Sequence, residues 1–314
     1  MTCFRNTKDP KISEQKRYKR ALTRDGLIIY DKEIPATIRF NHDETRKLLK
    51  KSINFDKLDH HCEVAHLEIS NKCNLGCSYC YVPNKNGKEL PAKAWKIIID
   101  NLAKAGVFQM SFGGGEPTLR KDLFKLAKFA EDAGLNLGMT TNGSELIHLN
   151  PKKLKKYFRQ INVSWHGNPE VFEEALMFLQ EHDIPAGINY TYMKNYVEHN
   201  DMIKFIAEEY NAELLYLVYK PVIKDKRKQI SGAEVYKVAK QAANEGLRVA
   251  VDGPCVDQCL MKKKFIDVDH MGNVYPCSFV RKPLGNLLKQ SMQKIWENRG
   301  EQEECPFVKF GKEK

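Results

Sequence analysis

The chain has 314 residues, enough for one large domain or two modest ones with a buried core. Apolar residues make up 42% and charged residues 29%, which excludes a disordered chain and is ordinary for a globular protein. No run of about 18 apolar residues is present, which excludes a membrane-spanning helix. The amino terminus lacks the apolar stretch of a secretory signal, so we expect a cytoplasmic protein.

The chain is basic, with 51 lysines and arginines against 40 aspartates and glutamates, a formal net charge of +11. Such a surface can attract an anionic substrate, an acidic peptide, a nucleic acid or an acidic electron-transfer partner, or it can be a solvated lysine-rich face. No single basic stripe interleaved with aromatic residues stands out, so a nucleic-acid partner is not expected.

Residues 1–61 are polar and basic, with only short apolar pieces such as Leu27 to Tyr30. We expect a leader or small extension here, with short strands and a helix near 43–52. This segment is short for a peptide-recognition domain, which slightly favours a small-molecule substrate over a peptide.

From residue 64, short apolar runs alternate with helical patterns, which predicts βα units and a parallel sheet. The expected strands are 64–69, 109–112, 135–140, 160–165, 186–192 and 213–219, and the expected helices between them are 92–105, 121–133, 151–158, 169–182 and 200–210. Six repeats predict an α/β fold with a partial (β/α)6 barrel over 62–222, whose active site lies beyond the carboxyl ends of the strands. A connecting helix and strand are expected in 223–252, and a small cysteine-rich extension in 253–314.

Nine cysteines in a chain without a secretory signal favour metal binding or catalysis over a disulfide framework. They are Cys3, Cys62, Cys73, Cys77, Cys80, Cys255, Cys259, Cys277 and Cys305. Three lie close together in the first third and four in the last 60 residues, which indicates two separate cysteine-bound centres. We interpret Cys62 as a packing residue and assign no role to Cys3.

The spacing of Cys73, Cys77 and Cys80 places three thiolates in one loop directly after the first strand. Cysteine thiolates are the usual ligands of a [4Fe–4S] cluster, and three of them leave one iron free to chelate another molecule. The cluster of an electron-transfer ferredoxin needs four cysteine ligands. A structural zinc site is the alternative, but it requires a fourth nearby ligand, and His60 and His61 lie upstream of any obvious register.

Further motifs stand at successive strand ends. Tyr79 precedes the third cysteine, Gly113 to Pro117 end the second strand, Thr140 to Gly143 end the third, and Ser164 ends the fourth. With these motifs the chain resembles the radical SAM superfamily over residues 62–222. The resemblance implies that S-adenosylmethionine (SAM) binds the open iron of the cluster and contacts residues of these motifs: Tyr79, Gly114, Gly115, Glu116, Pro117, Thr141, Asn142 and Ser164. Glu116 would be the acidic residue at the SAM amino group, and glycines let the backbone approach a ligand closely.

The resemblance implies reductive cleavage of SAM to methionine and a 5′-deoxyadenosyl radical, which abstracts hydrogen from a substrate. We expect a small molecule or cofactor precursor, with a peptide- or protein-modifying maturase as the alternative. The alternative from another class is a non-catalytic iron–sulfur electron carrier. The implied partner is a low-potential electron donor, flavodoxin or ferredoxin.

In the second cysteine group, Leu284 to Leu287 and Ile295-Trp296 lie between Cys277 and Cys305. This pattern is similar to the SPASM extension or its shorter relative, twitch. A full SPASM extension carries enough cysteines for two clusters, whereas here only Cys305 follows Cys277. The resemblance therefore implies one auxiliary [4Fe–4S] cluster, with a relay or structural role; scattered buried cysteines are the alternative. Its expected ligands are Cys255, Cys259, Cys277 and Cys305.

For some residues near strand ends the sequence leaves two roles possible, lining the pocket or packing in the core. They are His166, Tyr190, Tyr192, Tyr219 and Lys220. A lysine or tyrosine at such a place can hold an anionic group.

Overall fold

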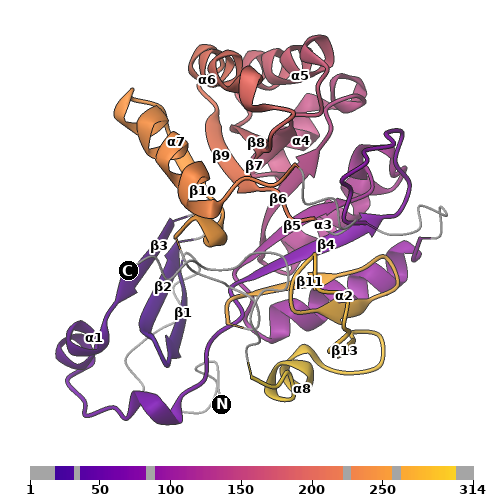
Figure 1. The fold of residues 1–314 in the computed structure, drawn as a ribbon. Coiled ribbons are helices and arrows are strands. Elements are labelled where there is room, and N and C mark those ends of the chain that lie inside the picture. Colours follow the sequence, from indigo (N-terminus) through magenta and orange to yellow (C-terminus); the bar gives the residue numbers. More distant parts are fainter. Residues whose placement is uncertain (1–17, 32–35, 83–88, 222–227, 257–262, 302–314) are drawn as a thin grey trace.

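The computed structural model describes residues 18–31, 36–82, 89–221, 228–256 and 263–301. Two sheets organise them, one of three antiparallel strands and one of ten strands. Figure 1 shows how the two sheets are arranged. Within these residues, no helix is long and apolar enough to cross a membrane.

The small sheet pairs β1 (Tyr18–Thr23), β2 (Gly26–Asp31) and β3 (Ala36–Phe40) in chain order. Gly26 adopts φ +119° and lies so close to β3 that a Cβ there would meet the Phe40 carbonyl oxygen at 2.0 Å, so the turn requires glycine. Helix α1 (His42–Leu49) follows behind an Asn41–Glu44 capping box. The expected helix is therefore confirmed, and it ends at Leu49 because Lys50 is left-handed.

The large sheet confirms the six predicted strands, each within two residues of its expected bounds. They are β4 (Val64–Ser70), β5 (Gln109–Gly114), β6 (Asn136–Thr141), β7 (Gln160–Ser164), β8 (Ala186–Tyr192) and β9 (Glu213–Val218). Each strand pairs in parallel with the next one in the chain. Their carboxyl ends therefore meet at one edge of the sheet.

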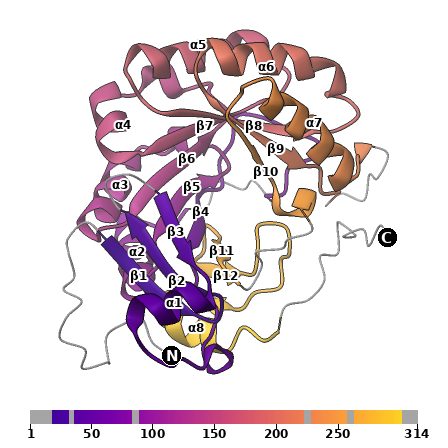
Figure 2. The same cartoon turned by 90° about the vertical axis from the view of Figure 1, so that its left-hand side faces the viewer.

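Helices connect the parallel strands and form the outer arc of the molecule in Figure 2. They are α2 (Ala92–Lys104), α3 (Leu123–Asp132), α4 (Pro151–Tyr157), α5 (Pro169–Glu181) and α6 (Asn200–Glu209). Each helix buries an apolar stripe against the sheet; in α2 this stripe includes Trp95, Ile98 and Leu102, which have no exposed surface. Short 3-10 turns occur at Phe55–Lys57, Pro117–Leu119, Leu146–His148, Val197–His199 and Gly253–Val256.

The sheet extends beyond the six predicted strands at both edges. After α7 (Gly232–Asn244), β10 (Val249–Val251) pairs in parallel with β9, and β11 (Phe265–Val268) pairs in parallel with β4. Then β12 (Asn273–Tyr275) and β13 (Gly285–Asn286) add antiparallel strands, followed by α8 (Met292–Glu297). In the described part of the chain no ladder joins β10 to β11, so the barrel is open between them.

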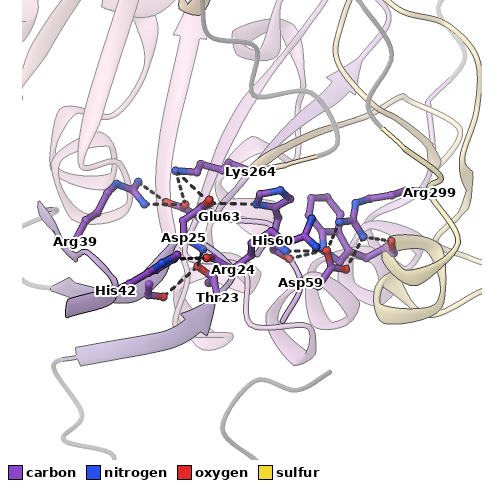
Figure 3. Close-up of polar contacts among 12 residues, drawn as sticks. Thr23, Arg24, Asp25, Arg39, His42, Asp59, His60, Glu63, Lys264 and Arg299 are labelled. Carbon is purple, nitrogen blue, oxygen red and sulfur yellow. Dashed lines mark hydrogen bonds and ion pairs between the residues drawn. The ribbon is translucent and has the colours of Figure 1, made fainter. Parts of the chain in front are cut away.

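Polar contacts link the small sheet, the barrel and the carboxyl-terminal extension, as Figure 3 shows. Arg39 of β3 donates two hydrogen bonds, of 2.9 and 2.6 Å, to the buried Glu63 carboxylate just before β4. On the other side Arg299 pairs with Asp59. At the amino-terminal ends of β5 and β6, the Tyr30 hydroxyl accepts a 2.6 Å hydrogen bond from the Asn136 side chain, and the Tyr30 ring stacks on Phe108.

Candidate functional site

The loop after β4 carries the cysteine triplet. The thiols of Cys73, Cys77 and Cys80 all line one cavity of about 420 Å³ at the carboxyl ends of the strands, and none forms a disulfide. The Leu75 N–H lies 3.4 Å from the Cys73 sulfur, a contact that stabilises a thiolate ligand. Across the described ranges, no three His, Cys, Asp or Glu side chains are placed to hold a single metal ion. Three thiols around one cavity fit the larger ligand sphere of a [4Fe–4S] cluster.

The glycine run at the end of β5 packs tightly against this loop. The Gly115 and Glu116 N–H groups donate to the carbonyls of Ser70 and Lys72, at 2.7 and 2.6 Å. A Cβ on Gly115 would lie 2.0 Å from the Lys72 oxygen, and Gly114 adopts φ +109°. We expected these glycines to allow close approach to a ligand. In the structure they also allow β5 to approach β4 and the cysteine loop.

Glu116 is buried, with 1% of its surface exposed, and joins the ends of β5 and β6. Its Oε1 accepts hydrogen bonds from the Thr118 N–H and hydroxyl and from the Thr141 hydroxyl, at 3.0, 2.6 and 2.7 Å. Its Oε2 accepts a 2.7 Å bond from the Asn142 N–H. Burial raises the pKa of Glu116, while these donors oppose the rise by stabilising the carboxylate.

Asn142 ties the end of β6 to the cysteine loop. Its side-chain N–H donates to the side-chain Oδ1 of Asn74 at 2.9 Å, and the Asn74 Nδ2 in turn donates to the Ser144 hydroxyl at 2.7 Å. The loop that carries the thiols is thus held by both β5 and β6.

His166, directly after β7, contacts the same loop. Its Nδ1 lies 2.9 Å from the Tyr79 hydroxyl and 3.5 Å from the Cys77 sulfur. Burial raises the pKa of Tyr79, and the ring meets Tyr196 edge-on at 6.2 Å between ring centres. His166 is therefore part of the cavity wall beside the thiols.

Most of the residues expected at the site line this cavity. Those that line it are Cys73, Cys77, Tyr79, Cys80, Gly114, Gly115, Glu116, Thr141, Asn142, Ser164, His166, Tyr219 and Lys220. Pro117 is buried in the 3-10 turn after β5 and is not among the lining residues. Tyr190 and Tyr192 are buried in the core instead, where their rings pack on Tyr216.

Sequence reasoning missed polar residues that face the barrel interior, including His66, Asn162, Asn189 and Thr191. Their signal was available, because alternate residues of a strand point to the same side. His66 Nδ1 lies 2.6 Å from the fully buried Asp267, which also accepts bonds from Ser278 and Arg281. Arg281 reaches Glu68 as well, so a buried charged cluster joins β4 to the extension.

Two of the four expected auxiliary ligands lie in the described residues, at opposite edges of the open barrel. Cys255 follows β10, and burial raises its pKa to about 11, while Cys277 follows β12. Their neighbours Asp252, Ser278 and Phe279 line the cavity, but neither cysteine is among its lining residues. Lys220 pairs with Asp252 and lies 4.6 Å from the centre of the Phe279 ring. The other two, Cys259 and Cys305, lie outside the described residues, as does Cys3.

Two family models match the chain. The radical SAM superfamily model covers residues 67–206, and the SPASM model, an iron–sulfur cluster-binding domain, covers residues 259–314. The first domain implies SAM and a [4Fe–4S] cluster, and the second implies auxiliary iron–sulfur binding. These matches confirm the family resemblance and the expected cofactors.

Individual relatives cover different shares of the chain. An AdoMet-dependent heme synthase from Methanosarcina barkeri is 26% identical over 282 residues, 74% of this chain and 81% of the relative. A PqqA peptide cyclase from Bradyrhizobium diazoefficiens is 47% identical over 79 residues, 24% of this chain but only 21% of the relative. Streptococcus suis SuiB bound to precursor peptide SuiA shares the fold, with a TM-score of 0.74 at 16% identity over 90% of this chain and 87% of SuiB.

Proposed function

Because the chain is a radical SAM protein with a SPASM iron–sulfur domain, we propose that it cleaves SAM reductively and abstracts hydrogen from an organic substrate. The observation that carries the proposal is one cavity that joins the three thiols, the glycine run and the end of β6. A cluster held by Cys73, Cys77 and Cys80 supplies, when bound, the electron that splits the sulfonium carbon–sulfur bond.

The chain's own residues bind and orient. Glu116 and Asn142 hold the loop and strand ends in register, and Tyr79 presents an aromatic ring beside the thiols. Leu215, Leu217 and Trp165 give the cavity an apolar wall that excludes water, which protects a reactive radical from side reactions.

We propose a small molecule or cofactor precursor as the substrate. Heme synthases from two organisms match 74% and 75% of this chain, whereas the match to PqqA peptide cyclase is confined to 24%. Peptide modification is the second candidate, because that shorter match has the higher identity, 47%.

The experiment is anaerobic reconstitution with iron and sulfide, reduction with dithionite in the presence of SAM, and chromatography for 5′-deoxyadenosine. We expect the product together with about eight irons per chain, four for each cluster. Cys77→Ala should abolish cleavage and remove about four irons. The matched control is Cys62→Ala, because Cys62 is a buried thiol in the core and should leave cleavage intact.

Full iron loading without 5′-deoxyadenosine would contradict the enzyme proposal and leave a non-catalytic iron–sulfur carrier. If the product forms, deuterated heme precursors and deuterated peptides can be compared as hydrogen donors. Deuterium in the 5′-deoxyadenosine from only one of these classes decides between the two candidate substrates.

A further inference from the structure

The cysteine loop has a cavity face and a solvent face. Exposure alternates along it: Lys72, Asn74, Gly76 and Ser78 are exposed, and the residues between them, including Cys73 and Cys77, line the cavity. A cluster bound to these thiols therefore lies just beneath a strip of protein surface. An electron can reach it there without passing through the cavity that holds SAM.

Two lysines, Lys72 and Lys228, border this solvent face, and a third, Lys194, adjoins Lys228. Lys72 begins the face, Lys228 Nζ lies 3.3 Å from the Ser78 hydroxyl, and the exposed Lys194 donates its backbone N–H to the Lys228 carbonyl at 3.2 Å. Lys72 also lies 3.6 Å from the Glu89 carboxylate. The Glu89 side chain is 18% exposed and also accepts a hydrogen bond from Ser70, so this pair offsets part of the Lys72 charge.

Two lysines on α2 and α3 are instead paired within their own helix. Lys96 pairs with Asp100 and Lys128 with Asp132, each one helical turn apart and at 2.7 Å. Such i,i+4 pairs cancel charge on the helix surface. Near the cysteine loop, the backbones of Lys194 and Lys228 meet from two separate segments of the chain, so two lysines lie close together where Lys228 contacts the loop.

The proposed function requires an electron from outside the protein, and electron transfer slows steeply with distance. We propose that Lys72, Lys194 and Lys228, with the solvent face of the loop, form the docking surface for an acidic, low-potential electron-transfer protein of the flavodoxin or ferredoxin type. Each SAM cleaved takes one electron from this donor, which is oxidised by one equivalent. Complementary charge accelerates such encounters by up to about 10- to 1,000-fold and makes them sensitive to salt.

The test compares two double variants of equal charge change in the reconstituted enzyme. Lys194→Glu/Lys228→Glu reverses charge at the loop, and Lys96→Glu/Lys128→Glu reverses it on α2 and α3. Cleavage of SAM is driven either by reduced flavodoxin or by saturating dithionite, a small reductant that needs no docking surface.

We expect the loop variant to lose about tenfold or more in kcat/KM for flavodoxin, together with most of its salt dependence. Its dithionite-driven rate should match that of the wild type, and the control variant should keep both rates. Equal loss in both variants, no loss in either, or loss under dithionite as well would overturn the docking surface. Failure of the wild type with dithionite would instead contradict the proposed function.

Discussion

Two buried glutamates have opposite environments within the same molecule. Glu116 is surrounded by donors, since both of its oxygens accept hydrogen bonds from Thr118, Thr141 and Asn142. Glu68, at 1% exposure, faces the equally buried Asp267. Burial and this second carboxylate raise the pKa of Glu68 to about 8, although Arg281 opposes the rise. The folded state therefore favours protonation of Glu68 more than the unfolded chain does.

This shift makes stability depend on pH. Because the folded pKa is raised from 4.5 to about 8, the contribution of Glu68 is complete below pH 4.5 and is lost as the pH rises through 8. We expect Glu68→Gln to flatten this fall, whose slope for one group is at most about 1.4 kcal/mol per pH unit. Anaerobic urea unfolding of both proteins from pH 5 to 9 measures how the free energy of unfolding depends on pH.

Other polar and charged groups face Glu68, namely Asp267, Asp269, Tyr81 and Arg281, with His66 next to Asp267. The comparison of Glu68→Gln with the wild type therefore measures Glu68 together with its coupling to these groups. The exposed pair of Glu131 with Lys156 provides the control, because Glu131→Gln should keep the wild-type slope. Parallel curves for the wild type and Glu68→Gln would contradict the raised pKa.

At the scale of elements, the end of β5 and the cysteine loop behave as one packed unit. A methyl group on Gly115 would overlap the Lys72 carbonyl oxygen at 2.0 Å, and backbone cannot yield as a flexible side chain can. Gly115→Ala should therefore displace the loop, lower stability by roughly 1–3 kcal/mol and reduce both bound iron and SAM cleavage. Iron analysis and thermal unfolding measure these effects.

Gly76 offers a control within the same loop. A Cβ there meets no atom within 4 Å, so Gly76→Ala should retain wild-type iron content and cleavage. If both alanine variants lost iron equally, the effect would lie in the flexibility of the loop and not in its packing against β5.

The elements differ in how far the sequence could predict them. Strands β4 to β9 were predictable because each is a local apolar run between turns, and the triplet because its three thiols lie within eight residues. The pairing of β11 with β4 was not, since it joins short segments about 200 residues apart and no local pattern encodes a partner. The contact of His66 with Asp267 was not predictable for the same reason, because the two residues are neighbours only through that pairing.

At the scale of the whole molecule, the charges before β4 hold three parts of the chain together. Glu63 accepts both hydrogen bonds from Arg39 of the small sheet, and Lys264, just before β11, lies 3.9 Å away, as Figure 3 shows. The backbone reinforces this junction, because the Glu63 N–H donates to the Lys264 carbonyl at 2.8 Å. Glu63 thus contacts both β3 of the small sheet and the residue that precedes β11.

Glu63→Gln tests whether this junction couples the small sheet to the barrel. The amide cannot pair with two cations, so we expect about 1–2 kcal/mol lower stability, with the partly exposed Arg39 limiting the loss. Hydrogen exchange should rise in β1 to β3 more than in the barrel. The control Asp43→Asn removes an exposed pair with Arg46 and should change stability by less than about 0.5 kcal/mol. Uniform exchange across both sheets in Glu63→Gln would mean that the small sheet is held mainly by Tyr30 and its apolar contacts.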